Sequence, residues 1–351
     1  MSRKISHSLV SGRAGAGTGV DAGGQGLKID WFKTNLGRLL WRDVSESVLE
    51  WYLGGTNYGY CAGGYNNPGG ASNVIDKWSL SSDANATDVG DLIASNGNNQ
   101  KVGNSSTTHG YASAGIRAGV EWYDIIQKWT FASDANAADV ANLGAARSGP
   151  AGADSADYGF VQGGKESGDT RVNKIEKFTF ASDNNATDVG DITVAREQAS
   201  GCSSATHGYC VGGYASGESD VIDKFSTVSD GNSSDVGNLA YHVVGPACSS
   251  STTHGYAAGG EDSGASYIDY IQKFSFSSDG NASDIGNLVR VKTIVSCGVT
   301  SGSHGYAAGG KVDPSSTSIT DIDKYSHSSD GNATDVGDLT LSRYAAAGVQ
   351  Y

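Results

Sequence analysis

The sequence predicts an all-β fold, a six-bladed β-propeller with an N-terminal arm, and three observations lead to this prediction. A unit of about 50 residues occurs six times between Tyr58 and the C-terminus. Each copy divides into four short strands separated by glycine-rich turns. Of the 351 residues, 51 are glycine and only four are proline, and 9% are aromatic. This composition suits short strands and tight turns, and it excludes collagen, which needs a three-residue glycine period.

Two markers define each copy of the unit, and both indicate strands. The first is Gly-Tyr-Ala-Ala-Gly-Gly, as at residues 255–260, a strand of small residues that ends at a glycine pair where the chain can turn sharply. The second starts with Ile-Gln-Lys-Phe-Ser-Phe at residues 271–276, which alternates apolar and polar residues. Ser-Asp-Gly-Asn then predicts a hairpin, and Asp-Ile-Gly-Asn-Leu an outer strand. A segment rich in glycine, serine and alanine between copies predicts the remaining strand.

The two ends of the repeat predict how the ring closes. The first copy begins directly at the second-strand motif, Tyr58-Gly59-Tyr60, whereas the last copy continues into a first-strand segment at residues 343–348. We therefore expect the C-terminal strand to complete the blade that begins at Tyr58, which leaves no free sheet edge. The predicted domains are an N-terminal anchoring arm, residues 1–57, and a six-bladed propeller, residues 58–351.

The N-terminal arm does not repeat and has a different charge. Residues 1–42 contain seven basic and two acidic residues, although the whole chain has a net charge of −14. Apolar residues of the arm recur at helical spacing, so we expect it to be partly helical or irregular. We predict that it anchors the protein to a partner, and the alternative is that it covers one propeller face. The predicted anchor residues are Trp31, Phe32, Leu36, Leu40 and Trp41.

Charge and cysteine content exclude several classes of protein. A net charge of −14 argues against nucleic-acid binding, which requires clustered cations. No apolar run is long enough for a membrane span or a secretory signal. The cysteines are odd in number and lack paired spacing, so we expect them to be reduced and buried, with a Cys202–Cys210 bridge as the alternative. The five positions are Cys61, Cys202, Cys210, Cys248 and Cys297.

No pattern in the sequence indicates catalysis. Four histidines recur at one position of the repeat (His109, His207, His254 and His304). They could form a metal-binding ring, but tyrosine replaces them in two copies, which favours packing. The hairpin oxygens at Asp279, Asn281 and Ser283 resemble the start of a calcium loop, but no closing glutamate follows. We therefore predict no catalytic residue, no metal and no cofactor.

The loops between the second and third strands differ in every copy, whereas the turns on the opposite face repeat. Variable loops on a rigid scaffold commonly bind ligands, although loops also vary where nothing restrains them. Aromatic side chains in these loops can stack on sugar rings. The predicted ligand-binding residues are Tyr65, Trp122, Tyr123, Tyr214 and Tyr267.

The glycine pairs, the aromatic strand Ile-Glu-Lys-Phe-Thr-Phe at residues 175–180 and the period resemble kelch repeats. A downstream tryptophan of kelch units is missing here, since Val189 or Val336 stands near its place. The amino-acid sequence of the repeated hairpin and outer strand also resembles that of repeat proteins of tailed cyanobacterial phages. This resemblance covers residues 58–351.

The phage resemblance implies a non-enzymatic structural protein at the virion surface, in a tail fibre, baseplate or capsid decoration. Its expected partners are other virion proteins through the arm, host-surface glycans through the propeller, and further copies of the chain within an assembly. The alternatives are a non-viral lectin-like or adaptor propeller and, less favoured, a glycan-active enzyme.

Overall fold

The computed structural model describes residues 57–67, 69–93, 99–117, 121–264, 266–293, 297–312 and 317–351. It also describes the backbone of four short strands between Gly19 and Asp43. Two compact units, Met1–Leu49 and Glu50–Tyr351, can be separated by their internal contacts. All regular structure in the described residues is β-strand, as the sequence predicts.

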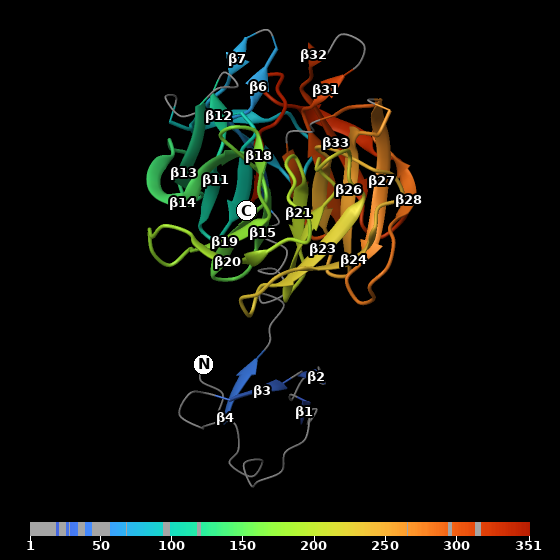
Figure 1. Cartoon of the computed structure of the whole chain (residues 1–351). Coiled ribbons are helices and arrows are strands. Elements are labelled where there is room, and N and C mark those ends of the chain that lie inside the picture. Colours follow the sequence, from blue (N-terminus) through green and yellow to red (C-terminus); the bar gives the residue numbers. More distant parts are fainter. Residues whose placement is uncertain are drawn as a thin grey trace. The chain divides into compact units, whose positions relative to one another are not determined.

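The second unit is a β-propeller in which antiparallel sheets surround a central axis (Figure 1). The strands of each sheet follow one another outward from the axis. The innermost strands are β10 (Val102–Ser105), β15 (Ala151–Asp154), β21 (Ser200–Ser203), β25 (Ala247–Ser250), β29 (Cys297–Thr300) and β35 (Ala347–Gln350). The second strands are β11 (His109–Ser113), β16 (Tyr158–Gln162), β22 (His207–Val211), β26 (His254–Glu261), β30 (His304–Ala308) and β5 (Tyr58–Ala62).

The outer half of each sheet follows the same order. The third strands are β13 (Glu121–Thr130), β19 (Lys174–Thr179), β23 (Val221–Ser226), β27 (Tyr267–Ser275), β33 (Asp321–Ser326) and β8 (Val74–Ser79). The outermost strands are β14 (Ala138–Ser148), β20 (Thr187–Asp191), β24 (Ser234–Asn238), β28 (Ser283–Asn287), β34 (Thr334–Asp338) and β9 (Thr87–Asp91).

Short strands lie in the loops that join second to third strands. They are β6 (Tyr65–Asn66), β7 (Gly70–Ala71), β12 (Ile116–Arg117), β17 (Lys165–Glu166), β18 (Thr170–Arg171), β31 (Lys311–Val312) and β32 (Thr317–Ser318). Hairpins β6–β7 and β31–β32 project from the same end of the propeller (Figure 1). We call this end the upper face and the opposite end, with the Ser-Asp-Gly-Asn hairpins, the lower face.

The sheets differ from the prediction of six separate four-stranded blades. Five sheets have four strands, whereas β10, β11, β13 and β14 belong to a seven-stranded sheet. The difference arises because β14 is eleven residues long and continues to the upper face. There Arg147 and Ser148 pair with β17, which joins the loop strands β17 and β18 to this sheet.

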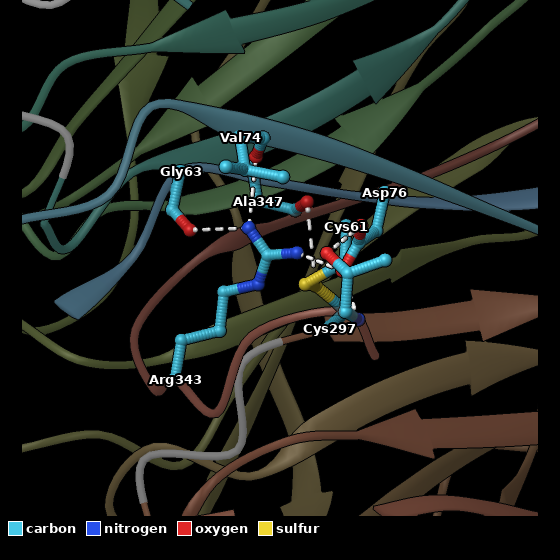
Figure 2. Close-up of a disulfide and its surroundings, with 8 residues drawn as sticks. Cys61, Gly63, Val74, Asp76, Cys297, Arg343 and Ala347 are labelled. Carbon is cyan, nitrogen blue, oxygen red and sulfur yellow. Dashed lines mark hydrogen bonds and ion pairs between the residues drawn. A yellow bond between two sulfur atoms is a disulfide. The ribbon is translucent and has the colours of Figure 1, made fainter. Parts of the chain in front are cut away.

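The predicted closure of the ring by the C-terminal strand is confirmed. Strand β35 pairs antiparallel with β5, with Gly348 opposite Cys61, and completes the four-stranded sheet β35-β5-β8-β9. Just before β35, the Arg343 guanidinium donates to the carbonyl oxygens of Val74 and Gly63, at 2.8 and 3.2 Å, and pairs with Asp76 (Figure 2). The first and last strands of the propeller therefore belong to one sheet.

The prediction that all cysteines are reduced is wrong. Cys61 on β5 and Cys297 on β29 form a disulfide, while Cys202, Cys210 and Cys248 are free and buried, so the alternative Cys202–Cys210 bridge is also absent. The two bonded residues lie 236 positions apart in sequence. Sequence spacing could not reveal the pair, because ring closure alone brings β5 beside β29.

The predicted helical character of the arm is also wrong for the residues that are described. Residues Ile29–Lys33 (β3) and Leu39–Asp43 (β4) form an antiparallel strand pair with Trp31 opposite Trp41, and Phe32 opposite Leu40. Isoleucine, tryptophan and phenylalanine favour strands, and this preference outweighs the helical spacing. A second pair joins β1 (Gly19–Val20) to β2 (Gly26–Leu27). Leu36 lies outside the described residues.

Glycines allow the sheets to approach the axis closely. On β21, a Cβ atom added to Gly201 would lie 2.1 Å from the carbonyl oxygen of Gly152 on β15. The same clash occurs between β29 and β25, where a Cβ atom on Gly298 would lie 2.1 Å from the Cys248 oxygen. Because both obstacles are backbone atoms, no side-chain movement can relieve them. Glycine at this place is therefore required by the packing of neighbouring inner strands.

We predict that Gly201→Ala destabilises the propeller by about 3 kcal/mol or more, because its methyl group forces two inner strands apart. The matched control is Gly217→Ala, where nothing lies within 4 Å of the added Cβ atom. Urea denaturation of both variants measures the difference. Equal stability of the two variants would contradict the packing argument.

Candidate ligand-binding face

The repeated aspartate of the lower face joins neighbouring sheets. In each copy its carboxylate pairs with a lysine on the third strand of the preceding copy, as between Lys77 and Asp134 at 3.0 Å. Each such pair is partly exposed and contributes little alone. The other five are Lys128–Asp183, Lys177–Asp230, Lys224–Asp279, Lys273–Asp330 and Lys324–Asp83.

The asparagine of the same hairpin makes a second contact between sheets. Asn281 Oδ1 accepts a hydrogen bond from the backbone N–H of Asn238 at 3.0 Å, and the corresponding bond occurs in every copy. The oxygen atoms that resemble a calcium loop in the sequence therefore hold the ring together. This structural role explains why Asp and Asn recur.

The recurring histidines are packing residues beside these ion pairs. His254 Nδ1 lies 2.8 Å from Thr253 Oγ1, and burial together with Lys273 lowers the pKa of His254 below its usual value. Where tyrosine replaces histidine, the lysine lies over the ring instead, with Lys77 Nζ 4.5 Å from the Tyr58 centroid. Within the described residues, no group of histidine, cysteine, aspartate and glutamate is arranged to hold a metal ion.

The upper face carries the loops whose residues vary between copies. Tyr65 on β6 forms a bridge with Tyr344, and their ring centroids are 5.6 Å apart. Lys311 on β31 places its Nζ atom 5.5 Å from the centre of the Tyr344 ring. Burial, Tyr65 and Tyr267 together raise the pKa of Tyr344, so its hydroxyl stays protonated. The partly exposed side chains of Tyr65, Tyr344 and Lys311 form a cluster that we call the tyrosine–lysine patch.

A second cluster on the upper face surrounds Tyr214. The guanidinium carbon of Arg171 lies 4.6 Å from the centre of the Tyr214 ring. Arg171 also pairs with Glu197 at 2.8 Å, and Lys165 pairs with the same carboxylate at 3.3 Å. Glu197 is only 5% exposed, so the two cations hold a nearly buried carboxylate. The Tyr214 ring is thus fixed by charged neighbours from the adjacent copy of the repeat.

The remaining predicted ligand residues lie on other strands of the same face. Trp122 and Tyr123 are at the start of β13, where Trp122 is paired with Ile116. Tyr267 starts β27 and is paired with Glu261. The predicted set therefore comes from four different copies of the repeat and does not form one site. The structure brings Tyr65 together with Tyr344, and Tyr267 is close enough to influence the Tyr344 hydroxyl.

Sequence analysis missed Tyr344, Lys311 and Arg171 as members of these clusters. Tyr344 was assigned to a first-strand segment, and its position after Arg343 gave no sign that it faces Tyr65. The pairing is visible only in the structure, where Tyr65 bridges to Tyr344 and Tyr214 to Glu197.

The propeller also has a central channel between its inner strands. Cavities of about 100 and 120 Å³ lie at its lower and upper mouths. Six side-chain oxygens surround the lower mouth, and each accepts a backbone N–H from the neighbouring inner strand at 2.8–3.3 Å. They belong to Ser105, Asp154, Ser203, Ser250, Thr300 and Gln350.

Asp154 is the one carboxylate in this ring. Its Oδ1 atom accepts from Asn104 Nδ2 at 2.7 Å, and Oδ2 accepts from the Ser105 N–H at 3.0 Å. Burial nevertheless raises the pKa of Asp154 to about 7. The hydrogen bonds therefore do not fully compensate for lost hydration of the charge, and the carboxyl group titrates near neutral pH.

Comparisons with known proteins give no family for the chain: no protein-family model matches it, and neither does any curated protein. In the described part of the chain, no helix has the length and apolar character to cross a membrane.

We predict that Asp154 makes the protein less stable as the pH rises. Its folded-state pKa of about 7 exceeds the unfolded value of 3.8, so the stabilisation present below pH 3.8 is lost between about pH 4 and 7. Asp154→Ser restores the residue found at the equivalent Ser203 and removes this dependence. At pH 8 we expect the variant to be more stable than the native protein by about 1–3 kcal/mol.

Urea denaturation of both proteins at pH 4 and pH 8 measures this effect. The difference between them should grow with pH. A constant difference across this range would show that Asp154 does not titrate between these pH values.

Proposed function

We propose that this chain is a non-enzymatic structural protein of a phage virion, anchored by its N-terminal arm and able to bind host-surface glycans through the upper face. It would be a kelch-like propeller with six blades, displayed at the virion surface in a tail fibre, a baseplate or a capsid decoration. The assignment to a phage is based on the resemblance of the repeated hairpin and outer strand to phage repeat proteins.

Two observations support six blades, and neither depends on how many strands a sheet contains. The first four strands of the seven-stranded sheet have the same order as the other sheets. Six side-chain oxygens link six inner strands into one closed ring at the lower mouth. This closed ring of inner strands supports the proposal of six blades.

The observation that carries the binding proposal is the difference between the two faces of the propeller. On the lower face the repeated lysine, aspartate and asparagine side chains are engaged between sheets. The upper face instead displays side chains that vary between copies, such as Tyr344, whose equivalents are Glu197 and Val244. The residues that hold the sheets together on the lower face are the same in every copy. The residues of the upper face differ from copy to copy.

The chemistry of the tyrosine–lysine patch suits a sugar. The faces of Tyr65 and Tyr344 offer apolar area for the C–H groups of a sugar ring, and their hydroxyls offer hydrogen bonds. Lys311 adds a cation that attracts acidic sugars, such as those with a carboxylate. The first described residue of the propeller, Asn57, donates its backbone N–H to the Tyr351 carbonyl oxygen at 2.7 Å.

Two other functions compete with this proposal. A non-viral lectin-like or adaptor propeller would use the same upper face but would not occur in virions. A glycan-active enzyme would convert its ligand, so product formation on a glycan array would favour it.

We predict that Tyr65→Ala weakens binding to acidic glycans at least tenfold, because it removes one of the two stacking rings. The matched control is Tyr58→Ala, which removes a 38% exposed tyrosine of the lower face. Glycan arrays followed by calorimetry on the best ligand measure the affinities. Equal loss in both variants, or loss in neither, would contradict the location of the site.

We predict that a variant without residues 1–49 keeps the propeller but no longer joins the virion, because the two units have separate internal contacts. Mass spectrometry of gradient-purified particles measures incorporation and its ratio to the major capsid protein. The full-length chain serves as the control. If the full-length chain is absent from the particles, the virion assignment is wrong, and if the truncated chain is incorporated, the arm is not the anchor.

A further inference from the structure

The single disulfide of the described residues lies where the first and last strands of the propeller meet. Cys61 is on β5, the strand that β35 covers, and Cys297 is on β29, the innermost strand of the neighbouring sheet (Figure 2). Their Cα atoms are 5.8 Å apart, and both side chains are fully buried. The bond therefore joins two sheets directly across the closing interface.

The positions of Cys61 and Cys297 have equivalents at every other interface between neighbouring sheets, but different residues occupy them. Ala347 and Ala112 share one apolar cluster, as do Val102 and Val161, and Ala247 and Ala307. At one further interface Cys210 packs near Ala151, and Cys210 remains a free thiol. The remaining interface has Ser200 and Ala257 at these positions, so cysteine occupies both positions only where the ring closes.

This location gives the bond a specific mechanical effect. Within its own sheet, β5 is attached to the C-terminal part of the chain through the hydrogen bonds of β35. If β35 dissociates, the sheet β5-β8-β9 loses that connection and keeps non-covalent contacts with the neighbouring sheet, such as Lys324–Asp83 and the bond from the Asp338 N–H to Asn85. The Cys61–Cys297 bond bypasses β35, because it ties β5 to β29 directly. With the bond formed, loss of β35 alone cannot open the ring.

We propose that Cys61 and Cys297 form a covalent lock that closes the propeller after the chain leaves a reducing cytoplasm, and that the protein works in an oxidising environment. Stable disulfides are typical of proteins outside the cytosol. The inference goes beyond the proposed function, because it holds for any extracellular use of the propeller.

The oxidation is a thiol–disulfide exchange with a low-molecular-weight disulfide. The thiolate of one cysteine attacks a sulfur of that disulfide, forms a mixed disulfide and releases one thiolate. The thiolate of the second cysteine then attacks the mixed disulfide, forms the Cys61–Cys297 bond and releases the second thiolate. The protein loses two electrons and two protons, and the small disulfide becomes two thiols.

Because both sulfur atoms are buried, the disulfide must form before the closing sheet is in place or during a transient opening. Both sulfur atoms lie in an apolar cluster with Trp78, Val299 and Tyr306. An oxidant reaches them while the closing sheet is open, during folding or in a transient opening. Once the sheet closes, the same burial excludes reductants. The lock should therefore resist reduction in the folded protein and become reducible when the protein is unfolded.

The first experiment counts thiols in the full-length protein. Protein made in a reducing bacterial cytoplasm is denatured in iodoacetamide, before and after it is refolded from urea with oxidised glutathione, and analysed by intact mass and peptide mapping. We expect five alkylated cysteines before oxidation and three afterwards, with Cys61 and Cys297 unmodified. Five after oxidation would overturn the proposal. Protein isolated from its natural source should show three, and five there would exclude an oxidising environment.

The second experiment tests the mechanical effect. We expect oxidation to slow unfolding in urea at least tenfold for the native sequence and not at all for Cys61→Ala or Cys297→Ala. Alanine occurs naturally at both positions in other copies, as at Ala112 and Ala347. The matched control Cys210→Ala removes a buried free thiol at the position equivalent to Cys61, and it should keep the full effect of oxidation. Equal unfolding rates of oxidised and reduced native protein would contradict the lock.

Discussion

Closure of the ring is the constraint on which the rest of the structure depends, because one sheet must combine the first and last strands of the propeller. The closing interface uses the contacts that also join the internal sheets: Lys324 pairs with Asp83, and the Asp338 N–H donates to Asn85. Because the contacts are the same, the propeller has no weaker seam in its hydrogen bonding. The disulfide adds a covalent tie, and closure of a loop of this length is worth about 5 kcal/mol in the chain-entropy model.

The third strand of each sheet has a buried hydrogen-bond acceptor at the same position. The acceptor recurs, but it is charged in some copies and neutral in others. Asp223 accepts from the Thr193 N–H and pairs with the buried Arg196 at 2.9 Å. Gln272 accepts from the Tyr241 N–H at 2.9 Å in the same way, and here the place of the arginine is taken by Val243. A buried carboxylate without a cation would be costly, so charge and partner change together. The requirement is an acceptor for the neighbouring sheet, which aspartate or glutamine can satisfy.

The sequence predicts the fold well because repeat length, glycine pairs and hairpins are local or periodic signals. Closure by β35 follows from the same pattern, since the missing first strand of one copy is present at the other end. The disulfide was not predictable, because Cys61 and Cys297 become neighbours only when the ring is closed. The tyrosine–lysine patch was only half predicted, since Tyr65 is in a loop and Tyr344 in a connection of another copy. The strands at Trp31 and Trp41 show that helical spacing in a short apolar segment does not specify a helix.

The upper rim of the channel explains why sequence variation can be concentrated on that face. Gln100 and Gln198 adopt φ angles of 56° and 52°, where the equivalent Gly149 and Gly245 have 60° and 62°. Such angles cost a non-glycine residue about 1 kcal/mol or more. They are held by backbone hydrogen bonds that pass from copy to copy, such as Gln198 N–H to Gly149 O at 2.7 Å. The rim is thus fixed by main-chain atoms, so the side chains and loops above it can change without loss of the ring.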